Sequence, residues 1–193
     1  MGVDFVSFGI GCPWPRPGEE ADFSSVDAVC RDVLAANPNA LLLPRFGVDP
    51  PEWWRQAHPD DVMVWEDGSQ SHGAVVSSEA YRRDAAQRTA ALVRHLEETF
   101  GDRMAGYHPC GQHTGEWFYL GTWASPLNGY SVGDARDFRR WLAQTYGTDA
   151  ALCEAWGNPN VTLQTAAVPS AQARRAAPAG ILRDPVAERA ILD

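Results

Sequence analysis

The amino-acid sequence predicts an α/β protein with a parallel sheet, because segments typical of strands and of helices alternate along most of the chain. Two short apolar runs, residues 3–10 and 41–46, are the first predicted strands. A third predicted strand covers residues 103–108. Each strand is followed, directly or after a loop, by a stretch whose apolar residues recur at helical spacing. Consecutive strand–helix units of this kind form parallel sheets with right-handed crossovers.

The first unit is bounded by residues that favour turns and helix ends. Val, Phe and Ile dominate residues 3–10, and a Gly- and Pro-rich stretch, residues 9–13, closes this strand. Ser24 or Ser25 is expected to cap the helix that follows. Residues 37–38, Asn-Pro, stop that helix, because a residue before proline avoids the helical conformation.

The second unit contains a long insertion. Residues 41–46 form a nearly continuous apolar run, which is typical of a strand buried on both faces of a parallel sheet. The polar segment 47–77 is too long for a simple connection, and such loops are usually functional or disordered. The longest predicted helix begins at Ser77 or Ser78 and ends at Gly101.

Two further helices are predicted after the third strand. The first covers residues 131–146, and its Phe138, Trp141 and Leu142 are expected to face the core. Asp149 is expected to cap a shorter helix that follows. The chain then becomes rich in Ala, Pro and Gln and loses its periodicity. We therefore divide it into one domain, residues 1–157, and an irregular C-terminal segment, residues 158–193, with a short helix near its end.

Composition excludes several classes of function. The chain has 193 residues, which suits one domain with a substantial core. Its net charge is −9, with 25 acidic against 16 basic residues, so no nucleic-acid partner is expected. The four cysteines form no C-x-x-C pair, and no stretch approaches the ~20 apolar residues of a membrane span. We expect no membrane association and a cytoplasmic location.

Glu116 is the most informative residue. It follows the predicted strand 103–108 in a loop with two glycines, two histidines and a proline, and four aromatic residues lie close to it in the sequence. Functional groups concentrate on loops at the C-terminal ends of parallel strands. An apolar, aromatic setting raises the pKa of a carboxyl group, as an acid catalyst requires. The alternative is an ordinary surface glutamate.

Other side chains are candidates for ligand contacts. Arg45 ends the second strand, where its side chain can hold a substrate hydroxyl or pair with Glu116; a structural salt bridge is an equal alternative. Of Trp53 and Trp54, we expect one to contact ligand and the other to pack. Three further candidates flank Glu116 in the sequence: His108, His113 and Trp117.

A metal site is the alternative use of this region. His108, Cys110, His113 and Glu116 lie within nine residues, and their side chains are all zinc ligands. Their spacing is loose and no second cluster completes the set, so we predict no metal. Neither a nucleotide-binding glycine motif nor a G-x-S-x-G elbow is present, so no cofactor and no serine-hydrolase chemistry are expected.

Several short motifs occur together in a particular order. They are Asp49-Pro-Pro-Glu-Trp-Trp54, His58-Pro59, Gly106-Tyr-His with Glu116, Phe138-Arg-Arg-Trp-Leu142, Tyr146-Gly147, Ala151-Leu152 and Ala155-Trp-Gly157. In this order and spacing the chain resembles the glycoside hydrolases with a (β/α)8 barrel, closest to the family 42 β-galactosidases. The resemblance implies a partial (β/α)8, or TIM, barrel of about three to four parallel strand–helix units, because a full barrel needs ~250 residues.

The resemblance also implies a reaction. Glu116 occupies the position of the general acid/base, and a retaining glycosidase needs a second carboxylate ~5 Å away as nucleophile. Two departures stand out: Gly115 replaces the asparagine that the family places before the acid/base, and no residue matches the nucleophile. Four acidic side chains of the polar insertion are candidates for that role, but the resemblance assigns it to none of them: Asp49, Glu52, Glu66 and Asp67.

Two hypotheses follow for the function. The first is a β-galactosidase-like hydrolase of carbohydrate substrates with Glu116 as proton donor. The second is a non-catalytic half-barrel that binds carbohydrate or self-assembles. In either case we expect a homo-oligomer, because an open part of a barrel leaves an apolar edge and an uncovered inner face.

Overall fold

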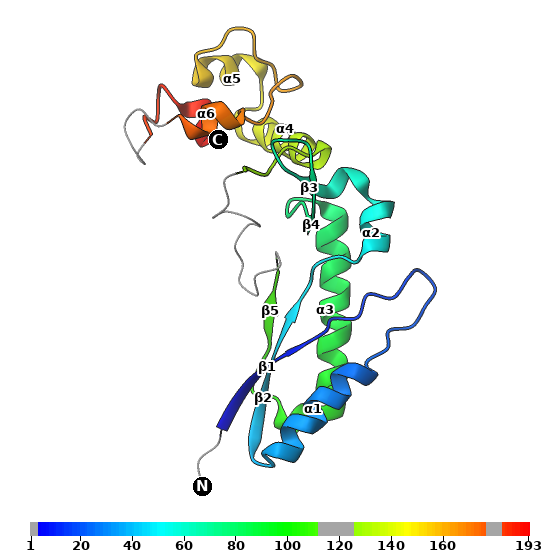
Figure 1. The fold of residues 1–193 in the computed structure, drawn as a ribbon. Helices are drawn as coiled ribbons and strands as arrows, with labels where there is room; N and C mark the ends of the chain where they lie inside the picture. Colours follow the sequence, from blue (N-terminus) through cyan, green and yellow to red (C-terminus); the bar gives the residue numbers. More distant parts are fainter. Residues whose placement is uncertain (1–3, 112–125, 177–182) are drawn as a thin grey trace.

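The computed structural model describes residues 4–111, 126–176 and 183–193. Figure 1 shows two parts: a parallel sheet with helices over one face, and a second group of helices beyond the far end of the longest helix. The sheet has the order β1-β2-β5 and contains β1 (Asp4–Ile10), β2 (Ala40–Gly47) and β5 (His108–Cys110). Both pairs of strands are parallel, which confirms the predicted parallel arrangement.

The third predicted strand is displaced along the chain. Residues 101–103 form a short 3-10 helix, η2 (Gly101–Arg103), and Met104 makes only an isolated bridge to Leu42. The Arg103 guanidinium instead donates to the carbonyl of Ala40, at 2.7 Å. Regular pairing begins only at His108, opposite Arg45. The prediction of a strand over residues 103–108 was therefore wrong in its boundaries.

Two helices, α1 (Ser24–Ala36) and α3 (Glu79–Phe100), cover the same face of the sheet. Ser78 caps α3 as expected, since its side chain accepts a hydrogen bond from the Tyr81 amide at 3.2 Å. The serine cap predicted for α1 is absent: Phe23 occupies the cap position and makes no side-chain bond. The core between sheet and helices includes Leu42, Phe46, Trp54, Leu92 and Leu96.

The polar insertion has structure of its own, which the sequence did not reveal. It contains α2 (Glu52–Ala57), the 3-10 helix η1 (Pro59–Asp61), and a hairpin of β3 (Val62–Val64) and β4 (Gln70–Ala74). The hairpin turn is closed by the Trp65 amide, which donates to the Ser69 carbonyl at 2.9 Å. Gly68 in this turn has φ 83°, a conformation that favours glycine.

The remaining helices form a second group, namely α4 (Val132–Tyr146), α5 (Asp149–Trp156), α6 (Ala171–Arg175) and α7 (Arg189–Leu192). Leu142, Leu152, Val161 and Ala166 are buried together in a small core. The C-terminal stretch therefore packs on α4 and α5 through Val161 and Ala166.

Three details of this group differ from expectation. Thr148, one residue before the expected Asp149, caps α5 by accepting from the Ala151 amide at 3.2 Å. Trp141 is 42% exposed and does not face the core. Helix α6 was not predicted at all, because its five residues are too few to show a period.

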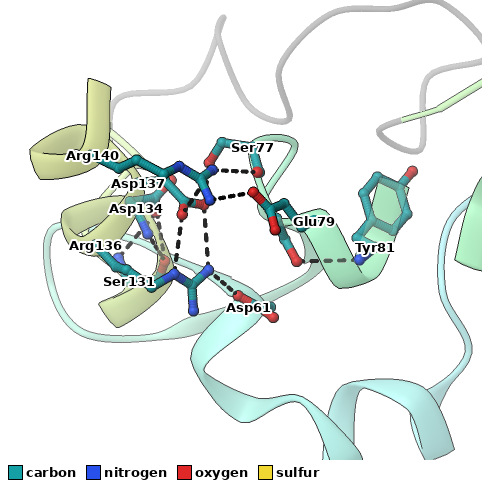
Figure 2. A network of polar contacts seen from close by, with 10 residues as sticks. Asp61, Ser77, Glu79, Tyr81, Ser131, Asp134, Arg136, Asp137 and Arg140 are labelled. Carbon is teal, nitrogen blue, oxygen red and sulfur yellow. Dashed lines mark hydrogen bonds and ion pairs between the residues drawn. The ribbon is translucent and has the colours of Figure 1, made fainter. Parts of the chain in front are cut away.

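A polar network joins α4 to η1 and to the start of α3 (Figure 2). Arg136 bonds to Asp61 at 2.7 Å and to Asp137 at 3.0 Å, and Asp137 accepts from the Ser77 hydroxyl at 2.8 Å. Arg140 adds an ion pair with Glu79 at 2.6 Å. Because Asp61 and Asp137 are both buried, their charges need these partners, and the network fixes α4 against the first part of the chain.

Candidate functional site

A hollow lies at the C-terminal ends of the sheet strands. Its volume is about 280 Å³, and it is lined by Gly9, Arg45, Phe46, Gly47, Asp49, Cys110 and Gly111. All three strands contribute to it at or just before their final residues. The C-terminal edge of a parallel sheet is where ligand sites of such folds are built.

Strand alternation places Arg45 at this hollow. Side chains of β2 alternate between buried and half-buried, with Leu42 and Phe46 in the core beneath the helices. Arg45 therefore lies on the opposite face, where the register sets it beside Gly9 of β1 and His108 of β5. Its Nε donates to the Cys110 sulfur at 3.3 Å, which fixes the guanidinium near the rim of β5.

The C-terminal end of β5 is hydrogen-bonded to the loop after β2. The Val48 amide donates to the Cys110 carbonyl at 3.0 Å, so the two chain segments leave the sheet together. Glu116 follows six residues after Cys110 and lies outside the described residues, as do His113 and Trp117. His108 is exposed at the start of β5, in register with Arg45.

The tandem tryptophans have different surroundings. Trp54 is 1% exposed, its indole N–H donates to Asp84 at 2.8 Å, and its ring stacks on His58 with centroids 4.3 Å apart. It therefore packs in the core and offers no face to a ligand. Trp53 is half-buried and donates to the Trp14 carbonyl at 3.3 Å. Neither residue lines the hollow.

The structure places the four acidic residues of the insertion that were considered for the nucleophile in different surroundings. Asp49 lines the hollow. Hydrogen bonds from Arg175 outweigh the opposing effect of burial and lower the pKa of Glu66 to about 2, so this carboxylate is engaged elsewhere. Glu52 bonds to Arg55, which lowers its pKa, and Asp67 accepts from Ser69 in the hairpin turn. Among the described residues, Asp49 is thus the candidate that reaches the site.

Sequence reasoning missed the glycines of the hollow, although a signal was present. Gly9 and Gly47 stand at the ends of two predicted strands, where we expected turn formation only at residues 9–13. Gly9 lies within β1, as the predicted strand over residues 3–10 implies. A glycine inside a strand often marks a place where a ligand or another backbone approaches closely.

The described part of the chain offers neither a metal-binding cluster nor a helix that could cross a membrane. Among residues 4–111, 126–176 and 183–193, no group of three His, Cys, Asp or Glu side chains could hold a metal ion. His113 and Glu116, which belong to the metal alternative, lie outside these ranges. None of the described helices is both long and apolar enough to cross a membrane.

Solved structures of glycosidases share this fold. The catalytic domain of a β-amylase from Paenibacillus polymyxa matches with TM-score 0.68 at 12% identity, over 93% of this chain and 49% of that chain. A cold-adapted β-galactosidase from Rahnella sp. R3 matches with TM-score 0.57 at 19% identity, over 86% of this chain and 24% of that chain. The arrangement of parallel strands and helices is therefore that of TIM-barrel glycosidases.

Sequence comparison identifies the family, which the structural similarity alone does not. The family model glycoside hydrolase 42, described as β-galactosidase, matches residues 1–160. A β-galactosidase from Arthrobacter sp. is 32% identical over 170 residues, and one from Halorubrum lacusprofundi is 34% identical over 116 residues. The chain belongs to glycoside hydrolase family 42, which confirms the predicted family. It covers 22% and 15% of the length of these two relatives, while the matches cover 81% and 56% of this chain.

Proposed function

We propose that the chain acts in the hydrolysis of β-galactosides or related β-glycosides by a retaining mechanism, with Glu116 as general acid/base. The observation that carries this proposal is the hollow at the C-terminal ends of β2 and β5, directly before the segment that contains Glu116, in a chain of family 42. Carbohydrate is the substrate class that the family implies. Neither cofactor nor metal takes part in this scheme.

The proposed chemistry needs two carboxyl groups. Glu116 in its acid form protonates the oxygen of the leaving sugar while a second carboxylate attacks the anomeric carbon. Glu116 then acts as base toward the water that hydrolyses the covalent intermediate. No residue of this sequence matches the nucleophile, which the resemblance places on a strand late in the barrel. The proposal therefore assigns this chain the proton transfer and part of the sugar contacts.

Several side chains are proposed to contact the sugar. Arg45 points into the hollow side of the sheet and supplies N–H donors to ring hydroxyls. His108 lies next to Arg45 in register and is exposed. Trp53, His113 and Trp117 complete the proposed set, whereas the burial of Trp54 gives that residue the packing role that we expected for one of the pair.

Hydrolysis of aryl β-galactosides tests the role of Glu116. A general acid matters most for a poor leaving group, so Glu116→Gln should lower kcat/KM by about 10²–10⁴-fold with phenyl β-galactoside. The loss should be much smaller with a dinitrophenyl leaving group, which departs without protonation. Glu154→Gln, a change of the same size on the exposed face of α5, is the control and should leave both rates unchanged. If wild type hydrolyses phenyl β-galactoside and Glu116→Gln does so at the same rate, the assignment is wrong.

The second hypothesis is a non-catalytic chain that binds carbohydrate or associates with further copies. Phe5 favours this hypothesis, because it is 70% exposed on β1, which is an edge strand of the sheet among the described residues. In this case the wild-type chain binds β-galactosides without hydrolysing either substrate. A homo-oligomeric state and a cytoplasmic location remain predictions from the sequence.

A further inference from the structure

A second hollow lies against α4, on the side of the helix that carries three arginines. Its volume is about 290 Å³, and it shares no lining residue with the hollow at the strand ends. The lining residues are Arg136, Arg139, Arg140, Ala143, Leu163 and Gln164. The first four recur on α4 at spacings of three and four residues, which places them on one side of the helix. Every charged residue of this lining is an arginine.

Grouped arginines call for an explanation, because like charges at this spacing destabilise a helix. The polar network in Figure 2 supplies one for two of the three. Arg136 forms ion pairs with Asp61 and Asp137, and Arg140 forms ion pairs with Glu79 and Asp137. These two arginines therefore hold α4 against η1 and the start of α3.

Arg139 takes no part in this network. Its Nε donates to the Ala166 carbonyl at 2.8 Å, which orients the guanidinium group. Among the described residues, no carboxylate pairs with Arg139, and its two terminal nitrogens bind no partner. The side chain is only half-buried, so these N–H groups are accessible from the hollow. One positive charge of the arginine group is thus left without an acidic partner in the part of the chain that the structure describes.

The lining defines the chemistry of a ligand. A guanidinium group donates hydrogen bonds and accepts none, and its planar fork fits the oxygens of phosphate or carboxylate. Phosphate fits this lining better, because its tetrahedral oxygens can accept from Arg139 on one side and from the Gln164 amide on the other. Ala143 and Leu163 add apolar surface that can contact an organic group bound to the phosphate. The volume lies at the lower end of the ~300–1,000 Å³ typical of ligand pockets, which suits a small molecule.

We propose that the hollow on α4 binds a phosphate group, either free or as the monoester of a small organic molecule, with Arg139 as its main hydrogen-bond donor. The remaining charge of Arg139 supplies the attraction, although the chain as a whole carries a net charge of −9. The site is independent of the proposed hydrolysis and requires no catalysis.

Calorimetric titration of the full chain with phenyl phosphate, in a phosphate-free buffer of low salt, tests the proposal. Arg139→Gln should weaken binding about tenfold or more, because it removes a charged donor. Arg94→Gln is the matched control: Arg94 is exposed on α3 and does not line this hollow. Inorganic phosphate is the second ligand, and circular dichroism verifies that each variant is folded.

A measurement on wild type locates the site without any variant. In an NMR titration of the labelled chain with phenyl phosphate, the backbone amides of Leu163 and Gln164 should shift, because both residues line the hollow. The amides of Gly9 and Gly47, which line the other hollow, should stay unchanged.

Saturable binding that Arg139→Gln weakens and Arg94→Gln does not supports the proposal. Tighter binding of phenyl phosphate than of inorganic phosphate then identifies an ester as the ligand, whereas equal affinities identify the phosphate group alone. The proposal is wrong if folded wild type shows no saturable binding in the millimolar range, or if Arg139→Gln binds as tightly as wild type. Shifts confined to Gly9 and Gly47 would also overturn it.

Discussion

At the scale of single residues, the contacts of His95 show what periodicity cannot predict. The sequence places His95 in the middle of a predicted helix, among charged residues. In the structure its Nε2 lies 2.6 Å from the Asp27 carboxylate of α1, and its ring stacks on Phe23 with centroids 4.2 Å apart. This pairing joins residues far apart in the sequence, so only the packing of α1 on α3 creates it.

Asp27 should therefore contribute to stability in a pH-dependent way. Burial raises its pKa, but hydrogen bonds and charges from His95 and Arg31 outweigh this effect, and the net pKa is lowered from 3.8. A depressed pKa gives stability that is present above pH 3.8 and lost as pH falls through the folded-state value. We expect Asp27→Asn to cost about 1 kcal/mol in the free energy of unfolding at pH 7.

Urea unfolding at pH 7 and at pH 3 checks this prediction. The difference between wild type and Asp27→Asn should shrink at the lower pH, because wild-type Asp27 is then increasingly protonated. Asp32→Asn, on the exposed side of the same helix, is the control and should have little effect. A difference that is the same at both pH values would contradict the pairing of Asp27 with His95.

Gly133 is a residue whose size the fold restricts. A Cβ atom there would lie 2.6 Å from the Asp60 carbonyl oxygen and 3.0 Å from the Asp61 carboxylate. Because the closest atom is backbone, Gly133→Ala must move α4 away from η1 and should cost about 1–3 kcal/mol of stability. Gly101→Ala is the matched control, since φ is −40° there and the nearest atom is a flexible glutamate oxygen at 3.7 Å. Equal unfolding midpoints for the two variants would argue against a close contact of α4 with η1.

Among the helices and strands, those that local sequence determines were predicted well. The apolar run of β2 and the capped, periodic helix α3 were predictable because burial and helix capping leave a direct signature. β5 was misplaced because His108, Pro109 and Cys110 have little strand character of their own. Their pairing is imposed by the register with β2. The predicted parallel strands indicated a site at their C-terminal ends. The shape of the hollow depends on individual side chains, which the hydrophobic periodicity of the sequence does not reveal.

Helix α6 secures the segment that follows the Glu116 region. The Glu66 amide donates to the Leu127 carbonyl at 2.8 Å, and the Leu127 amide donates back to the Glu66 carboxylate at 3.0 Å. Arg175 of α6 binds the same carboxylate with two N–H groups, and Arg174 donates to the Asn128 carbonyl at 2.7 Å. Residues 127–128 are thus fixed between the β3–β4 hairpin and α6.

Loss of the Glu66 charge should loosen this attachment. We expect Glu66→Gln to accelerate hydrogen exchange of the Leu127 amide, because the charged acceptor and its pair with Arg175 are both lost. The pKa of Glu66 is about 2 against an ordinary 4.5, so in wild type the contact is complete above pH 4.5 and is lost as pH falls through about 2. Asp67→Asn, which removes only the charge on the acceptor of the two hydrogen bonds from Ser69 in the turn, should leave Leu127 protected. Unchanged exchange in Glu66→Gln would exclude the attachment.

At the scale of the whole molecule, the sheet is open. In the part that the structure describes, β1 and β5 each pair on one side only, and the helices α1 and α3 cover one face (Figure 1). Length, composition and the order of motifs predicted a partial barrel of family 42, and family membership is confirmed over residues 1–160. The number of barrel units, in contrast, stays a prediction, because the parallel sheet of the described residues has three strands and does not close.

An open edge favours association between copies. We expect light scattering to show a mass above that of the monomer, or aggregation, that increases with protein concentration. Phe5→Lys should reduce it, because a charge on an edge strand opposes pairing, and Phe5 is 70% exposed. Val186→Lys, at a position 81% exposed in the C-terminal stretch, is the control and should not change the mass. A constant monomer mass at high concentration would count against assembly through the sheet.

NMR titration of the labelled chain with methyl β-galactoside measures whether a sugar binds at the C-terminal edge of this sheet. The backbone amides of Gly9, Gly47 and Cys110 should shift with a common dissociation constant, because all three residues line the hollow. Asp4 and Ala40, at the opposite end of β1 and β2, should stay unchanged. Shifts confined to Asp4 and Ala40, or none at saturating sugar, would contradict it.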